Sequence, residues 1–177
     1  ITSTTNVLGI NEIEDIFIGP NNKLLLKSFD GQNCRLFLVN TDGTVDTSFG
    51  INGNIIVSTF TSIKEYELSD GFVVLDNDNN IIYTLMDFNT FTTTVKKYNQ
   101  NGSLNTTFGN SGSFQISNSV ITDVKTFSNE IYLSGASLSN NNGTANLLIA
   151  RLTSNGILDN SFNNNGVFIF NNNSNEE

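Results

Sequence analysis

The chain of 177 residues contains no histidine, no tryptophan, one proline, one cysteine and only 8 basic residues against 17 acidic ones. Without histidine it can form neither a Ser-His-Asp or Cys-His catalytic site nor a histidine-ligated metal centre. A single cysteine, Cys34, excludes an intrachain disulfide framework, and its apolar sequence neighbours favour a buried small hydrophobe. No apolar run approaches the roughly 18 residues of a membrane-spanning helix, so we expect no membrane span.

The acidic residues give the chain a net charge of −9. A surface of this charge repels phosphate groups, so we expect neither nucleic acid nor an anionic membrane as a partner. Asparagine is the commonest residue. It tolerates left-handed backbone conformations and bonds its own backbone, which indicates many tight turns. An AT-rich genome would raise the asparagine content equally well.

One motif occurs three times, over residues 42–53, 101–112 and 155–166, with the consensus Asx-Gly-x-aliphatic-Asx-x-Ser/Thr-Phe-x-x-x-Gly. Its first glycine recurs after 59 residues and then after 54. Repeats on this scale are typical of solenoids, propellers and arrays. The candidate site residues are these structural motif positions: Asp42, Gly43, Asp46, Phe49, Gly53, Asn101, Gly102, Asn105, Phe108, Gly112, Asn155, Gly156, Asp159, Phe162 and Gly166.

The motif positions have distinct expected roles. Asx-Gly is a strong turn signal, because both residues tolerate a positive φ. The second Asx is placed to accept hydrogen bonds from the next backbone amides, with a one-turn helix over 47–49 in the first copy. We expect the Phe to fill the apolar space between neighbouring repeats.

Each motif copy is preceded by three short runs rich in β-branched and aromatic residues and followed by a Gly-x-apolar-x-apolar segment. Such runs, separated by Asn, Asp, Gly and Ser, are typical of strands, and no window keeps a helical period. The sequence therefore predicts an all-β fold, a β-propeller-like array of about three four-stranded antiparallel blades. The expected divisions are an N-terminal strand or cap (1–14), blades at 15–60, 61–117 and 118–170, and an Asn-rich tail (171–177).

These residues resemble the delta-60 repeat family, and the resemblance covers nearly the whole chain. The third repeat fits most fully, from Ser128-Asn129-Glu130-Ile131-Tyr132-Leu133-Ser134-Gly135 through Gly166. The resemblance implies a propeller-like fold in a large surface-associated protein and implies no activity. Two departures concern turn geometry: Leu38 replaces the basic residue that precedes the Asx-Gly turn, and Asn163 replaces the glycine after Phe.

Three blades are too few for a closed ring, since propellers have roughly four to eight. The chain could belong to a longer propeller, pair with a second copy into a six-bladed ring, or have its ends covered by 1–14 and 171–177. Residues 5–9 could also supply a strand to another blade. We expect an assembly or part of a longer protein rather than an isolated monomer.

The carboxylates of the motif are poor candidates for catalysis, because Asp42 and Asp46 correspond to asparagines in the second copy. Turn and cap roles explain them better. The oxygens of Asn40, Asp42 and Asp46 have a calcium-loop spacing, but the second copy has no carboxylate, so we expect no metal and no cofactor. Lys96 and Lys97 are expected at the surface.

Two functions remain. The first is a non-enzymatic structural or protein-interaction scaffold in a surface or virion assembly, with self-association or a larger assembly as the partner. The alternative is a lectin-like module that binds a glycan; its weakness is the absence of tryptophan, and its stacking candidates are Tyr66, Tyr83, Tyr98 and Tyr132. Tyr83 and Tyr132 occupy expected strand positions, where packing in the core explains them better. An extracellular or particle-surface location suits both.

Overall fold

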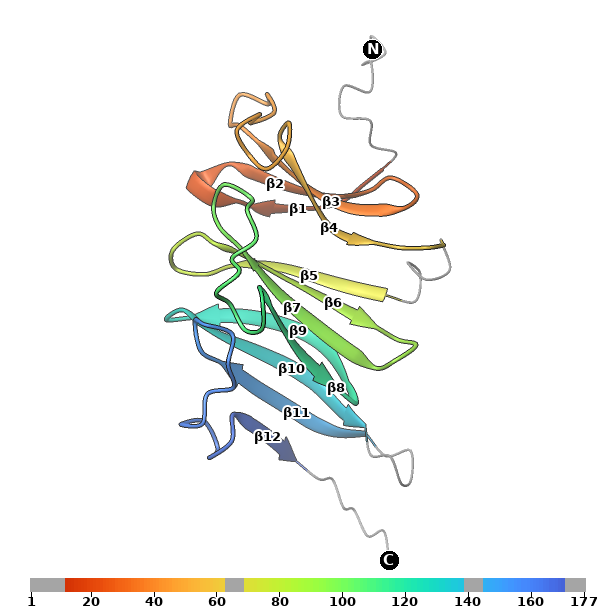
Figure 1. The fold of residues 1–177 in the computed structure, drawn as a ribbon, viewed down its shortest axis with the longest axis vertical. Helices are drawn as coiled ribbons and strands as arrows, with labels where there is room; N and C mark the ends of the chain where they lie inside the picture. Colours follow the sequence, from red (N-terminus) through yellow and green to blue (C-terminus); the bar gives the residue numbers. More distant parts are fainter. Residues whose placement is uncertain (1–11, 63–68, 139–144, 171–177) are drawn as a thin grey trace, which may run out of the picture. The chain divides into compact units, whose positions relative to one another are not determined.

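A computed structural model describes residues 12–62, 69–138 and 145–170 of the chain (Figure 1). Within these residues the fold is all-β, as predicted, with three four-stranded antiparallel sheets in which neighbouring strands follow one another along the chain. The residues that could supply an N-terminal strand, 5–9, lie outside the described residues, as does the Asn-rich tail 171–177.

The first sheet contains β1 (Glu12–Ile18), β2 (Leu24–Phe29), β3 (Asn33–Val39) and β4 (Asn54–Thr59). The second contains β5 (Ser69–Leu75), β6 (Ile81–Asp87), β7 (Thr92–Tyr98) and β8 (Ser113–Ser117). The third contains β9 (Ser119–Phe127), β10 (Glu130–Leu138), β11 (Ala145–Leu152) and β12 (Val167–Phe170). A short 3-10 turn, η1 (Pro20–Asn22), joins β1 to β2.

The chain divides into two compact units. Unit 1 comprises residues 1–67 and 100–103, and unit 2 comprises 68–99 and 104–177. Unit 1 therefore holds the first sheet together with the Asx-Gly turn of the second repeat, whereas unit 2 holds the second and third sheets. The division thus passes through the expected second blade, because that turn packs on the first motif.

Tight turns join the strands, and asparagine supplies much of their backbone geometry. Most non-glycine residues with a positive φ in the described ranges are asparagines. Between β9 and β10, Ser128 and Asn129 have φ values of 51° and 67°, and Phe127 pairs directly with Glu130. Two consecutive left-handed residues match the twist of the flanking strands, which explains the two-residue hairpin.

One face of the first sheet is buried. Leu25, Leu36 and Leu38 are buried there, and Cys34 is buried at the start of β3. Alternate residues point to opposite faces of a strand, so Phe37 and Val39 belong to the other face, with Leu26 opposite Phe37. That second face continues onto Ile16, which is paired with Leu26 but exposed.

The core of unit 2 lies between the second and third sheets. Ile82, Val95 and Phe108 meet residues of β9, β10 and β11 in one apolar cluster. From the third sheet this cluster contains Ile121, Val124, Ile131, Leu133, Leu148, Ala150 and Leu152. The alternating apolar residues of the strands thus lie on the facing sides of the two sheets. Burial of the apolar surface between these sheets stabilises unit 2.

Candidate functional site: the repeat motif and its groove

The second Asx of each motif accepts hydrogen bonds from the residue two positions later. Asp46 Oδ1 accepts from the Ser48 amide (3.1 Å) and hydroxyl (2.6 Å). Asn105 and Asp159 form the same pair of bonds with Thr107 and Ser161. Because both Asn and Asp carry the accepting oxygen, the turn works with either residue.

The expected one-turn helix over 47–49 is wrong. The Phe49 amide donates to the Asp46 carbonyl at 3.1 Å, which closes a turn. The next residue, Gly50, has a φ of 55°, in the left-handed region. A right-handed helix cannot continue through that residue, so only the turn forms.

The aspartates at the second Asx position of the motif have cationic partners. Asp159 pairs with Arg151 at 2.8 Å, the basic residue five positions before the motif glycine. In the first repeat that position is Leu38, and Lys23, the residue before β2, pairs instead with Asp46 at 2.6 Å. The departure at Leu38 is therefore compensated from a different segment of the chain.

In the second repeat the motif residue is neutral, and Lys97 turns elsewhere. Its Nζ lies 2.8 Å from Asp76 Oδ2 and 3.2 Å from the Ser154 carbonyl. Lys97 and Asp76 are both buried, so the expectation of a surface lysine is wrong. A weak signal for an ordered Asp76 was present in the Asp-x-Asp-x-Asn pattern of residues 76–80, and in the structure Asn80 donates to Asp76.

These contacts keep the motif carboxylates ionised. The Lys23 hydrogen bond, followed by the one from Ser48, lowers the pKa of Asp46 to about 2. Hydrogen bonds from Thr44 lower the pKa of Asp42. Burial by itself would raise the pKa of Asp76, but Lys97 and Asn80 bring it below the usual value. A general acid needs a pKa raised toward neutrality, and these shifts run in the opposite direction.

The Asx-Gly turn of one repeat covers the Phe of the preceding motif. In unit 1 the Gly50 amide donates to the Asn101 carbonyl at 2.8 Å. A Cβ on Gly102 would lie 3.0 Å from the Phe49 ring, and Gly102 has a φ of +84°. Both the close approach and the left-handed backbone therefore require glycine at this position.

Unit 2 repeats this arrangement. The Gly109 amide donates to the Asn155 carbonyl at 2.7 Å, and a Cβ on Gly156 would lie 2.7 Å from the Phe108 ring. Phe49 and Phe108 are each 1% exposed. Phe162 is only half-buried and lies beneath the Arg151 guanidinium at 5.1 Å. We call this contact between a Phe-Gly segment and the next Asx-Gly turn the clasp.

The last glycine of the motif serves packing inside one repeat. Gly53, Gly112 and Gly166 are buried. A Cβ at these positions would approach the aliphatic side chain at the motif's fourth position to 2.2, 2.8 and 2.8 Å; these side chains are Val45, Leu104 and Leu158. The recurrence of an aliphatic residue eight positions before a glycine is thus a packing requirement.

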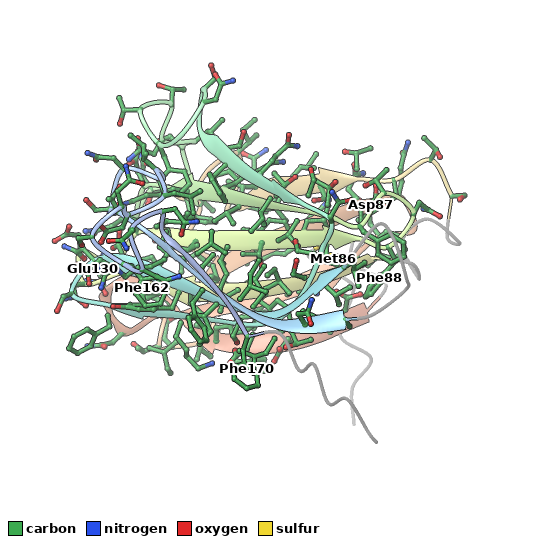
Figure 2. The ribbon with its side chains drawn as sticks, turned by 90° about the horizontal axis from the view of Figure 1, so that it is seen from below. Met86, Asp87, Phe88, Glu130, Phe162 and Phe170 are labelled. Atoms are coloured by element: carbon green, nitrogen blue, oxygen red, sulfur yellow. The ribbon has the colours of Figure 1, made fainter. Side chains whose placement is uncertain are left out.

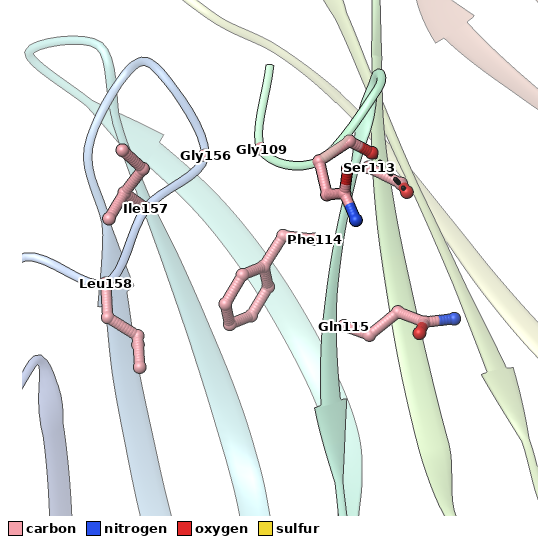
Figure 3. Close-up of a pocket in the computed structure, with 8 residues that line it drawn as sticks. Gly109, Ser113, Phe114, Gln115, Gly156, Ile157 and Leu158 are labelled. Atoms are coloured by element: carbon pink, nitrogen blue, oxygen red, sulfur yellow. Dashed lines mark hydrogen bonds between the residues drawn. The ribbon is translucent and has the colours of Figure 1, made fainter.

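A groove of about 500 Å³ adjoins the clasp of unit 2 (Figure 3). Its apolar part is formed by Phe114, Ile157 and Leu158, and Figure 3 shows the Phe114 ring directed toward Leu158. Its polar residues are already engaged: Gln115 donates to Thr94, and Ser113 donates to the Asn110 carbonyl. The lining contains no charged side chain, so the groove suits an apolar group.

The described residues contain no cluster of three or more Cys, Asp or Glu that could hold a metal ion. In the calcium-like loop, Asp42 accepts from Thr44, and Asn40 also donates to Thr44. Asp46 is held by Lys23 and Ser48. These oxygens therefore stabilise the loop itself.

Two of the candidate stacking tyrosines are unsuitable for a ligand. Tyr83 and Tyr98 are buried. Tyr132 is half-buried, with the Arg151 guanidinium 6.0 Å from its ring. Tyr66 lies outside the described residues. Over the described part of the chain, no helix has the length and apolar character needed to cross a bilayer.

Comparison with known proteins gives one family match. Residues 128–162 match the model of a family described as a β-propeller domain of unknown function, DUF5122. The matched segment runs from the β9–β10 turn to Phe162 in the third repeat, the copy that fits the motif consensus most fully. Searches of curated proteins and of solved structures gave no significant match.

Proposed function

We propose that the protein is a non-enzymatic repeat scaffold that binds other proteins in a surface or particle assembly. The observation that supports this proposal is an exposed apolar face on the third sheet. Leu147 pairs with Phe170, and Ile149 pairs with Phe168, across β11 and β12. Directly paired residues lie on the same face of a sheet, so these four side chains form one patch, which we call the outer face.

The outer face is open to solvent. Leu147 is 52% exposed and Phe170 is 56% exposed, and Figure 2 shows Phe162 and Phe170 among the side chains of unit 2. Apolar patches of this kind mark interaction surfaces in soluble proteins. Aromatic residues are also the side chains enriched in protein interfaces.

The state of the carboxylates supports a role without catalysis. Asp42, Asp46 and Asp159 each accept hydrogen bonds inside their own turn, and their pKa values are all lowered. Hydrolytic carboxylate pairs need one partner that remains protonated near neutral pH. The motif thus has the properties of a structural connector.

Photo-crosslinking tests this proposal. A benzoylphenylalanine replaces Phe170 in one variant and Phe88 in a matched control; Phe88 is also exposed but lies after β6. Both chains are irradiated in extract from the cells that produce the protein. We expect protein adducts at position 170 well above those at position 88. Equal yields would contradict the proposal, and selective retention on a glycan array would favour the lectin-like alternative.

A further inference from the structure

The outer face of the third sheet corresponds to a buried face of the second sheet. Val95 lies seven residues before Gly102, and Ile149 lies seven before Gly156. Phe114 follows its motif glycine by two residues, as Phe168 does. In unit 2, Val95 is fully buried in the cluster with the third sheet, and Phe114 packs against that cluster. The third sheet therefore has apolar side chains at the same positions, and a further sheet could cover them in the same way.

The first sheet shows the complementary surface. Leu24 pairs with Val39, as Ile131 pairs with Leu152, so Leu24 and Ile131 are equivalent. By the same register Ile16, opposite Leu26, is equivalent to Val124, opposite Leu133.

The exposure of these equivalent residues differs sharply. Val124 and Ile131 are 1% exposed in the core of unit 2, whereas Ile16 is 58% exposed and Leu24 is 36% exposed. Ile18, paired with Leu24, is 66% exposed. We call the face with Ile16, Ile18 and Leu24 the rear face of the first sheet; Leu26, Phe37 and Val39 on the same face are buried, so its exposed part lies along β1 and the start of β2. The equivalent positions of the third sheet are the ones through which that sheet packs on the second sheet.

At each of these two faces the chain supplies only one of the two segments that form a clasp. A Cβ on Gly43 would meet nothing within 4 Å, in contrast to Gly102 and Gly156. Asn163 occupies the position of Gly50 and Gly109, and its φ of 48° is close to their 55° and 56°. Asparagine thus preserves the left-handed geometry that presents the amide to a following turn.

We infer that a second copy of this chain docks head-to-tail, the outer face of one third sheet covering the rear face of the other copy's first sheet. This inference rests on the proposed function and names its partner. Phe162 then packs under the Gly43 turn, and the Asn163 amide donates to the Asp42 carbonyl. The contact repeats one that the chain already makes inside unit 2, and its two sides are different surfaces, so the interface is heterologous.

Two blocking substitutions test this inference. Gly43→Asn adds a side chain where Phe162 would pack, while Asn tolerates the positive φ of this position. Its control is Gly31→Asn, since Gly31 also has a positive φ and open space around it. Phe170→Asp places a charge on the outer face. Its control is Phe127→Asp, because Phe127 is exposed at the end of β9.

Sedimentation equilibrium gives the first readout. We expect the average mass of the wild-type chain and of both control variants to rise above 19.3 kDa with concentration, whereas Gly43→Asn and Phe170→Asp remain at 19.3 kDa. Circular dichroism and thermal melting establish that each variant is folded. A wild-type chain that stays at 19.3 kDa at all concentrations overturns the inference, and so does a folded Gly43→Asn variant that associates like wild type.

Mixing the two blocked variants gives the decisive readout. Gly43→Asn retains its outer face and Phe170→Asp retains its rear face, so an equimolar mixture should form a dimer and nothing larger. A mixture that remains monomeric, although the wild type associates, contradicts a head-to-tail interface. Adducts of the position-170 crosslinker with other proteins alone would also overturn the inference, while the proposed function would stand.

Discussion

At the scale of single residues, the second Asx of the motif is matched by a cation in the two repeats where it is ionised, and not in the repeat where it is neutral. Asp46 has Lys23 and Asp159 has Arg151, whereas Lys97, in the repeat with Asn105, pairs with Asp76. A buried or half-buried charge without a partner is costly. An Asp at the second Asx position therefore occurs with a cation that pairs with it, and the Asn at this position occurs with a lysine that pairs elsewhere. The turn geometry is common to all three copies, but its electrostatics differ.

The Asp46 ion pair predicts a specific loss of stability in acid. Its carboxyl pKa is about 2 in the folded chain and 3.8 ordinarily. A lowered folded pKa stabilises the fold above the unfolded value, and this contribution disappears as the pH falls from about 4 to about 2. We expect Asp46→Asn to lower the free energy of unfolding at pH 7 by about 0.5–1 kcal/mol and to match wild type at pH 2.

Urea unfolding at pH 7, 4 and 2 measures this difference. Lys23→Met removes the hydrogen bond that lowers the pKa of Asp46 most. We therefore expect its free energy of unfolding to lie below that of wild type at pH 7 and to match it at pH 2. Asparagine is the native residue at the equivalent Asn105, so the turn itself should persist. A gap between wild type and Asp46→Asn that is as large at pH 2 as at pH 7 would contradict the assignment.

A second residue-scale prediction concerns the closed clasp of unit 2. Gly156→Ala places a Cβ 2.7 Å from the Phe108 ring, whereas Gly31→Ala meets nothing, and both residues have a positive φ. The backbone strain is about 1 kcal/mol in each variant. Overpacking adds about 2 kcal/mol at Gly156 only.

Denaturant unfolding of the two variants isolates the packing contribution. The expected loss is about 3 kcal/mol for Gly156→Ala and about 1 kcal/mol for Gly31→Ala. Equal losses would mean that the Phe108 contact is not tight in solution.

At the scale of elements, the pair Lys97–Asp76 connects three segments of unit 2. Lys97 lies on β7, Asp76 begins the turn between β5 and β6, and Ser154 precedes the third Asx-Gly turn. The Asn77 amide also donates to Asn129 Oδ1 at 2.9 Å, across to the β9–β10 turn. Polar contacts thus fix the alignment of two sheets whose attraction is otherwise the non-directional burial of apolar surface.

Breaking this pair should be severe. Lys97→Met leaves a buried carboxylate without its cation, and we expect a loss of about 3–5 kcal/mol in the free energy of unfolding. The double variant Lys97→Met with Asp76→Asn should recover most of it, because asparagine keeps the oxygen that accepts from Asp78 and Asn80. A double-mutant cycle measures the coupling. Purely additive losses would show that the ion pair does not couple the two positions.

At the scale of the whole molecule, the net charge of −9 opposes contact between copies. Repulsion between like-charged copies is screened by salt, whereas burial of apolar faces is not weakened by it. We therefore expect head-to-tail association to strengthen as NaCl rises from about 0.05 to about 0.5 M, where the Debye length falls well below 10 Å. Sedimentation equilibrium at fixed protein concentration measures this. Weaker association at high salt would mean that ion pairs, and not the two apolar faces, hold the copies together.

The elements were largely predictable because their signals are local. Period-two runs between Asn and Gly turns gave the strands of all three sheets, and the Asx of each motif formed the expected side-chain turn. The prediction of a short helix over 47–49 was wrong because the left-handed conformation of Gly50 ends any helical turn. A locally encoded turn or helix forms only where the backbone conformation of the following residue allows it.

The partners of particular side chains were not predictable, because they depend on packing between segments far apart in the chain. Lys97 was expected at the surface and is buried against Asp76. Tyr98 was considered for stacking on a glycan and is buried.

By itself the sequence determined the repeat, the strand pattern and the chemistry of the turns, since each depends on residues within a few positions of one another. Only the tertiary structure decided which Phe is covered, which glycine must stay bare and which apolar residues remain in water. Gly43 and Gly156 hold the same position in the motif, yet one meets nothing and the other meets Phe108. The difference arises because a neighbouring repeat packs against one turn and not against the other, and no local preference encodes that.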